Sequence, residues 1–326
     1  MPIKRFTPGR LGLVIGTAIT MIVFNTMTLQ PSRQRHDCDM YHIQRILKGP
    51  TAQDDPQLVE WVKSQLVAPS ALPYNLSFFM SGMHKEAEVK GDQAMISPSQ
   101  EFILERVEDL YGDQLETPRL FLEAGAYDGE FLSNTLSLEH DYNWRGILVE
   151  ANPTFFERLL KKHRKSWAVN ACLNTKPYPS QESFMVGAEN PVGMNNNLRE
   201  EYLPEVERHI SQGSSRLAQF DDNSMQMEKQ IEVQCIPLYT IVKAMGIKHI
   251  DFLSLDVEGA ELGILDTVPW DKLSFSVMAI ESSYPEQLIK FLNEKGYRHI
   301  DSKRRDHIFV ANDSVKERYR DDDAGE

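Results

Sequence analysis

The chain is poor in cysteine, and its histidines lack metal-binding spacing. Three cysteines among 326 residues are too few for the disulfide framework of a small secreted domain. Cys172 and Cys235 lie inside apolar strand patterns, so we expect both to be buried thiols. Cys38 is a candidate for an intermolecular disulfide in an oxidising compartment. The nine histidines are scattered, so the sequence predicts no metal site.

Positive charge is also scarce, and no internal repeat is visible. The chain carries 35 Lys and Arg residues against 48 Asp and Glu residues, a net charge of −13. Nucleic-acid-binding surfaces are basic, so the sequence argues against a nucleic-acid partner. The composition, 41% hydrophobic and 25% charged, is that of a globular protein, and the length allows one large domain with appendages.

Residues 11–29 form an apolar run without a charged side chain, preceded by Lys4, Arg5 and Arg10. At ~1.5 Å per residue, a helix of this length spans roughly 28 Å, enough for the core of a bilayer. We favour a retained signal-anchor, which makes the membrane a partner of the chain. A cleaved signal peptide is the alternative, although residues 28–31 contain no convincing cleavage site.

The slight excess of basic residues before this run favours a cytoplasmic N-terminus, residues 1–10, and a large lumenal domain. Glycosylation sequons at Asn75 and Asn312 suit this type II arrangement. Residues 30–94 are expected to form a proline-punctuated lumenal stem.

Two short helices are predicted near this stem, at residues 56–66 and 99–111, each with apolar residues on one face. The second should pack on the sheet of the main domain. For both helices, packing is a better explanation than recognition of a partner.

Residues 119–135, RLFLEAGAYDGEFLSNT, read as a buried strand, an acid and a glycine turn. Apolar residues from Phe131 to Leu138 follow at helical spacing, so we expect a helix directly after the turn. Glycines let the backbone approach a ligand closely, and N–H groups at a helix start face it. The pattern therefore predicts a ligand site.

Acids end two further predicted strands. The strand at residues 146–149 ends in Glu150, where a carboxylate can accept the hydroxyl donors of a ribose. A third strand is predicted at 167–173, and a strand from residue 250 ends in Asp256, followed by Glu258. In one parallel sheet, these acids would all lie at the carboxyl edge, where open α/β sheets bind ligands.

The rest of the chain completes an α/β domain at residues 95–312. The polar stretch 187–230, with one helix around residues 200–210, reads equally well as a lid or as a loop without a role. The expected fold is a doubly wound, mostly parallel, Rossmann-like sheet, and residues 313–326 form a charged, disordered tail. The last predicted elements of the domain are a strand at 231–237, a helix at 238–245, a strand at 277–281, a helix at 285–295, and a hairpin of 297–301 with 307–310.

The motifs FLEAGAYDGEFLSNT, GILVEANP, VNACL and DFLSLDVEGAE resemble the FkbM-type methyltransferases in order and spacing, over roughly residues 95–312. The resemblance implies the seven-stranded sheet of class I methyltransferases and S-adenosylmethionine as cofactor. It also implies cofactor-binding residues, which are Glu123, Gly125, Tyr127, Asp128, Gly129, Glu150, Asn152, Asn170 and Cys172.

By this resemblance, the residues of the glycine turn hold the methionine end of the cofactor, Glu150 its ribose, and the backbone near 170–172 its adenine. Asp256 or Glu258 is the candidate catalytic base; alternatively, Glu258 simply caps the helix that follows. Two positions depart from the family pattern: Tyr127 stands where asparagine is common, and Glu123 where aspartate is common. The ring of Tyr127 would either line the pocket or narrow it.

With a membrane anchor in front, the chain resembles the arthropod Star and Star-like proteins within that family. This resemblance implies transport of transmembrane cargo, such as growth-factor precursors, between endoplasmic reticulum, Golgi and endosomes. An active O-methyltransferase acting on a glycan or small molecule is the alternative, since S-adenosylmethionine would need a carrier to reach a lumenal domain. A cleaved, secreted methyltransferase-like protein is a third interpretation.

Overall fold

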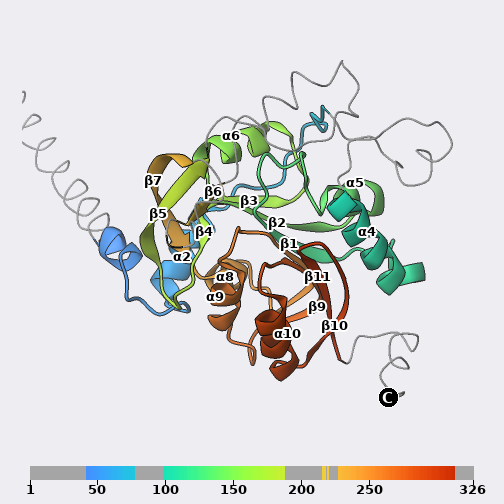
Figure 1. Cartoon of the computed structure of the whole chain (residues 1–326). Helices are drawn as coiled ribbons and strands as arrows, with labels where there is room; N and C mark the ends of the chain where they lie inside the picture. The colour runs from blue at the N-terminus through green and yellow to red at the C-terminus, as the bar shows by residue number, and fades with distance from the viewer. Residues whose placement is uncertain (1–41, 78–97, 188–214, 218, 220–226, 313–326) are drawn as a thin grey trace, which may run out of the picture. The chain divides into compact units, whose positions relative to one another are not determined.

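The computed structural model in Figure 1 describes residues 42–77, 98–187, 215–217, 219 and 227–312. The chain divides into two units, Met1–Ile46 and Leu47–Glu326. In the first unit, residues 42–46 are described and are helical. The predicted membrane segment, Cys38, the helix expected at 200–210 and the charged tail lie outside the described residues. Among the helices that the structure describes, none is long and apolar enough to cross a bilayer.

A seven-stranded sheet forms the centre of the second unit, with strand order β10-β11-β9-β8-β1-β2-β3. Every pairing from β9 to β3 is parallel, and β11 runs antiparallel to both of its neighbours. The predicted mostly parallel α/β sheet and its closing hairpin are therefore confirmed. The strands are β1 (Leu120–Ala124), β2 (Arg145–Glu150), β3 (Trp167–Asn170), β8 (His249–Leu255), β9 (Ser274–Glu281), β10 (Tyr297–Lys303) and β11 (Asp306–Ala311).

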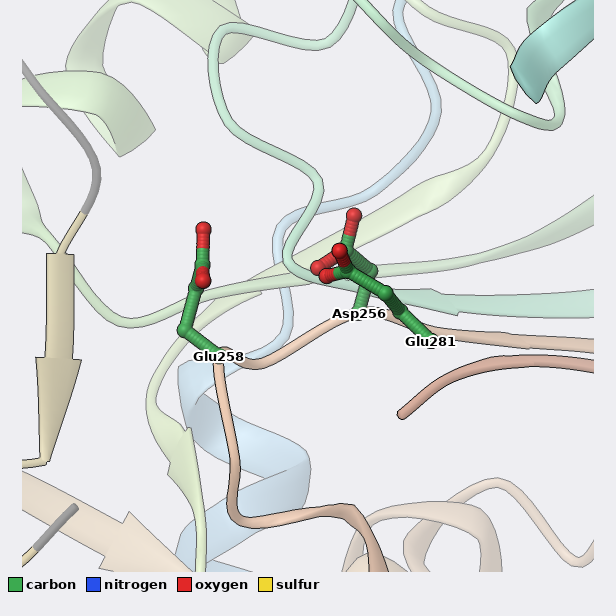
Figure 2. A group of neighbouring side chains, drawn as sticks. All are labelled: Asp256, Glu258 and Glu281. Carbon is green, nitrogen blue, oxygen red and sulfur yellow. The ribbon is translucent and has the colours of Figure 1, made fainter. Parts of the chain in front are cut away.

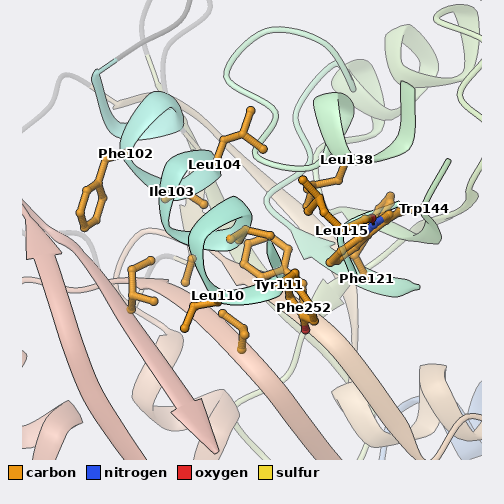
Figure 3. Packing of buried hydrophobic residues seen from close by; sticks show 14 of the residues in the cluster. Phe102, Ile103, Leu104, Leu110, Tyr111, Leu115, Phe121, Leu138, Trp144 and Phe252 are labelled. Carbon is orange, nitrogen blue, oxygen red and sulfur yellow. The ribbon is translucent and has the colours of Figure 1, made fainter. Parts of the chain in front are cut away.

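Helices cover both faces of this sheet (Figure 1). Helix α4, predicted to pack on the sheet, does so: its apolar residues meet Phe121 and Phe252 in a buried cluster (Figure 3). The ring of Tyr111 stands edge-on to Trp144, 5.1 Å between centroids. The helices are α2 (Pro56–Gln65), α4 (Pro98–Tyr111), α5 (Leu136–Tyr142), α6 (Pro153–Lys161), α8 (Leu238–Ala244), α9 (Glu261–Asp266) and α10 (Pro285–Glu294), with a 3₁₀ turn at Gly112–Gln114.

A second, four-stranded sheet lies beside the first, with strand order β4-β7-β5-β6. The strand predicted at 167–173 is two strands, because the chain leaves the first sheet at Ala171 and enters the second as β4. The strand predicted at 231–237 is part of β7 and belongs to this second sheet rather than to the main one. Its strands are β4 (Cys172–Leu173), β5 (Ser180–Gly187), β6 (Ser215–Leu217) and β7 (Met227–Ile236).

Cys172 and Cys235 form a disulfide, so their prediction as free thiols was wrong. The two residues face each other on the parallel neighbours β4 and β7, with Cα atoms 4.4 Å apart, a spacing that permits the bond. Both side chains are buried, as expected. Their partnership was invisible in the sequence because 63 residues separate them.

Residues 47–77 pack on the large domain, which we had expected to begin at residue 95. Asp55 caps helix α2 by accepting from the amides of Gln57 and Leu58 at 2.8 and 3.1 Å. The side chain of Leu58 is completely buried, and α2 packs against α8. Further on, Val67 forms an antiparallel bridge with Ala168 of the edge strand β3. This part of the expected stem therefore belongs to the compact unit.

Candidate functional site

The carboxyl ends of β1, β2 and β8 meet at one edge of the main sheet, as the sequence predicted. A cavity of about 60 Å³ lies there, lined by Gly125, Glu150 and Asp256 from these strand ends. The second sheet supplies the opposite wall through Phe184, Ser215 and Leu217. The cavity is thus bounded by acids on one side and mainly apolar side chains on the other.

The segment 125–135, here called the glycine loop, is a series of turns, so the helix predicted directly after the glycines was wrong. The carboxylate of Asp128 accepts hydrogen bonds from the amides of Glu130 and Phe131 at 2.9 and 2.7 Å. Leu132 has a left-handed φ of 58°, which a helix does not permit. Helix α5 therefore begins only at Leu136, and the glycine loop forms turns at the edge of the sheet.

Gly125 has a positive φ of 84°, and a Cβ at this position would overlap the backbone carbonyl of Asp256. Glycine is therefore required for the turn to pass over the end of β8. This close approach places the start of the loop on the floor of the cavity.

Glu150 is fixed at the end of β2 by two backbone donors. One carboxylate oxygen accepts from the amide of Tyr127 at 2.8 Å, and the other from the amide of Asn152 at 2.7 Å. Burial raises the pKa of Glu150 to about 7, although these amide donors oppose the rise. A carboxylate so placed has lone pairs left over for further donors in the cavity.

The ring of Tyr127 packs away from the cavity. Its centroid lies 4.1 Å from that of Phe155 and 6.1 Å from that of Phe131. Tyr127 is not among the described residues that line the cavity, so in this conformation its ring neither lines nor narrows the pocket.

The two predicted asparagines brace the backbone around Glu150. The side chain of Asn152 accepts from the Thr154 amide at 3.0 Å and so caps α6, and its amide nitrogen donates to Ser215 Oγ at 3.2 Å. The side chain of Asn170 donates to the carbonyl of Glu150 at 2.8 Å. Both asparagines therefore connect β2 to its surroundings.

Glu123 and Asp128, also predicted as cofactor ligands, face the glycine loop itself. Glu123 is 2% exposed and accepts from Ser133 Oγ at 2.9 Å, the Asn134 amide at 2.7 Å and Thr135 Oγ1 at 2.6 Å. Burial raises the pKa of this carboxyl group. Neither acid lines the cavity. In the structure they hold the loop in shape.

Three carboxylates gather beside the cavity, from Asp256, Glu258 and Glu281 (Figure 2). Desolvation, reinforced by a hydrogen bond to Glu281, raises the pKa of Asp256. Arg305 Nε lies 3.2 Å from a carboxylate oxygen of Glu281. Sequence reasoning missed Glu281, although it ends a predicted strand, as Glu150 does.

Glu258 does not cap helix α9, whose N-cap residue is Ala260 without a side-chain capping bond. Its carboxylate lies 3.8 Å from Arg216 Nη2 instead.

The sequence predicted no metal site, yet these three acids have the spacing of metal ligands: one oxygen of each lies within 4.8 Å of the others. The guanidinium groups of Arg216 and Arg305 offset part of this negative charge.

The fold and site together define a class I methyltransferase-like domain: a parallel sheet with one antiparallel strand, a glycine turn after β1 and an acid ending β2. The model of the methyltransferase FkbM domain matches residues 123–299. The chain belongs to this family, and the family resemblance stated from its motifs is confirmed. No curated protein matches the chain.

Several solved methyltransferase structures resemble the chain weakly. A precorrin-6y C5,15-methyltransferase from Geobacter metallireducens has 14% identity and a TM-score of 0.31, with 67% of this chain and 90% of that chain covered. The delta-N METTL16 methyltransferase domain has 13% identity and a TM-score of 0.35, with 79% and 97% covered. The N-terminal domain of human METTL16, in complex with SAH, has 14% identity and a TM-score of 0.32, with 70% and 78% covered. At such scores these similarities add nothing to the family assignment.

Proposed function

We propose that the domain binds S-adenosylmethionine at the carboxyl edge of the main sheet. One observation carries the proposal: the carboxylate of Glu150 ends β2 and lines the cavity next to Gly125, the arrangement in which α/β sheets hold a ribose beside a glycine turn. The glycine loop would take the methionine end. The backbone from Asn170 to Cys172 would take the adenine, since Ala171 and Cys172 also line the cavity.

The chemistry of these residues fits the cofactor, but the cavity is too small to hold it unless one of its walls moves. Ligand pockets usually enclose roughly 300 Å³ or more, well above the 60 Å³ present. The most mobile wall should be the short strand β6, which carries Ser215 and Leu217 and has three residues. We therefore expect β6 to shift outward when the cofactor enters.

The reaction that suits the site is methyl transfer to a hydroxyl group of a glycan or small molecule. When bound, S-adenosylmethionine supplies an electrophilic methyl group, and the acceptor must lose a proton to a base. The raised pKa of Asp256 favours its protonated form. Glu258 and Glu281, the other two carboxylates of the cluster, are the candidates for the base.

Calorimetric titration of the full chain with S-adenosylmethionine tests the binding step. We expect micromolar binding, weakened by about tenfold or more in Glu150→Gln, because an amide keeps the shape but loses one acceptor and the charge. A chain that is folded by circular dichroism but releases no heat on titration contradicts the proposal.

We propose a second role, transport of transmembrane cargo by a membrane-tethered, Star-like protein of the endoplasmic reticulum, Golgi or endosomes. The disulfide between Cys172 and Cys235 supports it, because such bonds persist in oxidising compartments such as the lumen of the secretory pathway. A lumenal domain would meet S-adenosylmethionine only through a carrier, and the small cavity agrees with a fold kept without turnover. The apolar run at residues 11–29 supports the tether.

Protease protection in sealed microsomes tests this second role. We expect the domain to be protected until detergent is added, and Asn75 to carry a glycan that Asn75→Gln removes. Digestion of the domain in intact microsomes would place it on the cytoplasmic side and favour the enzyme instead.

A further inference from the structure

A buried ion pair lies beneath the glycine loop. Arg164, between α6 and β3, places its Nε 3.1 Å from Glu139 Oε1, and the two side chains are 2% and 0% exposed. The guanidinium lowers the pKa of Glu139 against the opposing effect of burial, as do hydrogen bonds from the Lys165 amide and Ser166 Oγ. Both side chains are therefore charged, and a buried charged pair needs a full set of hydrogen bonds.

The glycine loop supplies those hydrogen bonds to Arg164. Nη1 donates to the carbonyl of Gly129 at 2.5 Å and to Ser133 Oγ at 3.2 Å, and Nη2 donates to Thr135 Oγ1 at 3.1 Å. Both hydroxyl groups donate in turn to Glu123. A single rigid guanidinium thus fixes the middle and the end of the loop against β1.

A segment from the N-terminal side reaches the same groups. Residues 66–77, here called the strap, run along the outside of β3, where Val67 pairs with Ala168. Tyr74 Oη donates to Glu139 Oε1 at 3.1 Å, and the amide of Ser77 donates to Glu130 Oε1, in the glycine loop, at 2.7 Å.

Lys165, the residue after Arg164, also contacts the strap. Lys165 Nζ donates to the carbonyls of Ser70 and Leu72 and lies 4.7 Å from the ring centre of Tyr74. Arg164 therefore contacts the glycine loop, and the adjacent Lys165 contacts the strap.

We propose that Arg164 is a positioning residue for the glycine loop and that the strap acts on the loop through Glu139 and Glu130. The loop amide of Tyr127 holds Glu150, so the shape of the loop also sets the orientation of the carboxylate in the cavity. Loss of Arg164 leaves the Gly129 carbonyl, two hydroxyl groups and the Glu139 carboxylate short of a buried donor. The identity of the ligand rests on the proposed function, whereas the shape of the loop does not.

Hydrogen exchange and calorimetry on the full chain test the proposal with Arg164→Met. We expect amide exchange in residues 125–135 to rise at least tenfold and S-adenosylmethionine binding to weaken about tenfold, the range found when a supporting hydrogen bond is removed. Arg164→Lys, which retains the charge and one bond, should restore part of both.

Arg119→Met is the matched control. Arg119 also makes a partly buried ion pair, 2.8 Å to Asp251, at the opposite end of β1. We expect this variant to lose thermal stability without changing exchange in the loop. Equal exchange in the loops of Arg164→Met and wild type, or the same rise in the control, would overturn the proposal.

Two further variants keep the test decisive. If Arg164→Met does not fold, Thr135→Val takes its place: it removes the hydroxyl that accepts from Arg164 and donates to Glu123, and should loosen the loop. Tyr74→Phe deletes the contact of the strap with Glu139 and should raise loop exchange by a smaller factor; no change would remove the strap from the proposal. A wild-type chain that binds no cofactor refutes the proposed function alone, since loop exchange still reads the role of Arg164.

Discussion

At the scale of single residues, two carboxyl groups of the site have raised pKa values for different reasons. Burial, together with the nearby charge of Asp128, raises the pKa of Glu150 to about 7, although backbone amides favour its charged form. Asp256 adds to burial a hydrogen bond and the repulsion of Glu281. The first group is therefore poised to titrate near neutral pH, whereas for the second the causes named all favour the protonated form.

Cofactor affinity should follow the charge of Glu150. If the carboxylate accepts the ribose hydroxyls, affinity rises with pH through about 7, by roughly ninefold between pH 6 and pH 8, since the ionised fraction changes from about a tenth to nine tenths. Calorimetry at both pH values measures this. Glu150→Gln should show a flat profile, and a wild-type profile that is equally flat would exclude the charged acceptor.

Asp256→Asn should stabilise the protein at neutral and alkaline pH. The folded-state pKa of Asp256 is raised, so its contribution to stability is present below the unfolded value, ~3.9, and is lost as pH rises through the folded value. An asparagine does not ionise, so the variant does not lose stability in this way as the pH rises. Thermal midpoints should differ little at pH 4 and increasingly towards pH 8; a constant difference would contradict this account.

At the scale of elements, the disulfide joins two neighbouring strands of the second sheet. The bond joins β4, which continues from β3, to β7, and closes a long segment that includes β5 and β6. β4 and β6 are the opposite edge strands of this sheet, so the bond does not oppose the outward shift expected of β6.

Removing the disulfide should destabilise the domain by about 4 kcal/mol, the loop-closure value for a separation of 63 residues. Urea unfolding of a Cys172→Ser, Cys235→Ser double variant, compared with wild type, measures the loss. Wild type in reductant should match the variant. An unchanged midpoint in both would show that the bond is absent in solution.

Elements with a local sequence pattern were predicted correctly. Prediction failed where contacts with residues distant in the sequence determine the local structure. The apolar runs of β1, β2 and β8 and their terminal acids Glu150 and Asp256 were recognisable. The break at Ala171 carries no clear local signal, because apolar residues resume directly after Asn170. The glycine loop has helical spacing, yet Arg164 and Glu123 hold it in turns. Arg164 itself reads as one charge in a basic run.

At the scale of the whole molecule, the large unit begins at Leu47 rather than at the first residue of the family match. Helix α2 buries Leu58 and Val62 against the domain, and the strap pairs with β3. The N-terminal segment is thus part of the same folded body as the candidate site.

A chain beginning at residue 95 should be less stable than one beginning at residue 47. Loss of the burial of Leu58 and Val62 alone costs about 4 kcal/mol, at 1.5–3 kcal/mol for each side chain. Thermal unfolding of the two chains compares them directly. Similar midpoints would mean that α2 and the strap are dispensable for folding.

The bridge between Val67 and Ala168 bears on how the protein behaves at high concentration. Strand β3 is an outer strand of the main sheet, and an open outer strand invites another chain to add to it. The amides and carbonyls of Val67 and Ala168 bond to each other, at 2.8 and 3.0 Å, and so block the middle of β3. We therefore expect the strap to reduce aggregation, because without it the backbone of β3 could pair with a strand of another molecule.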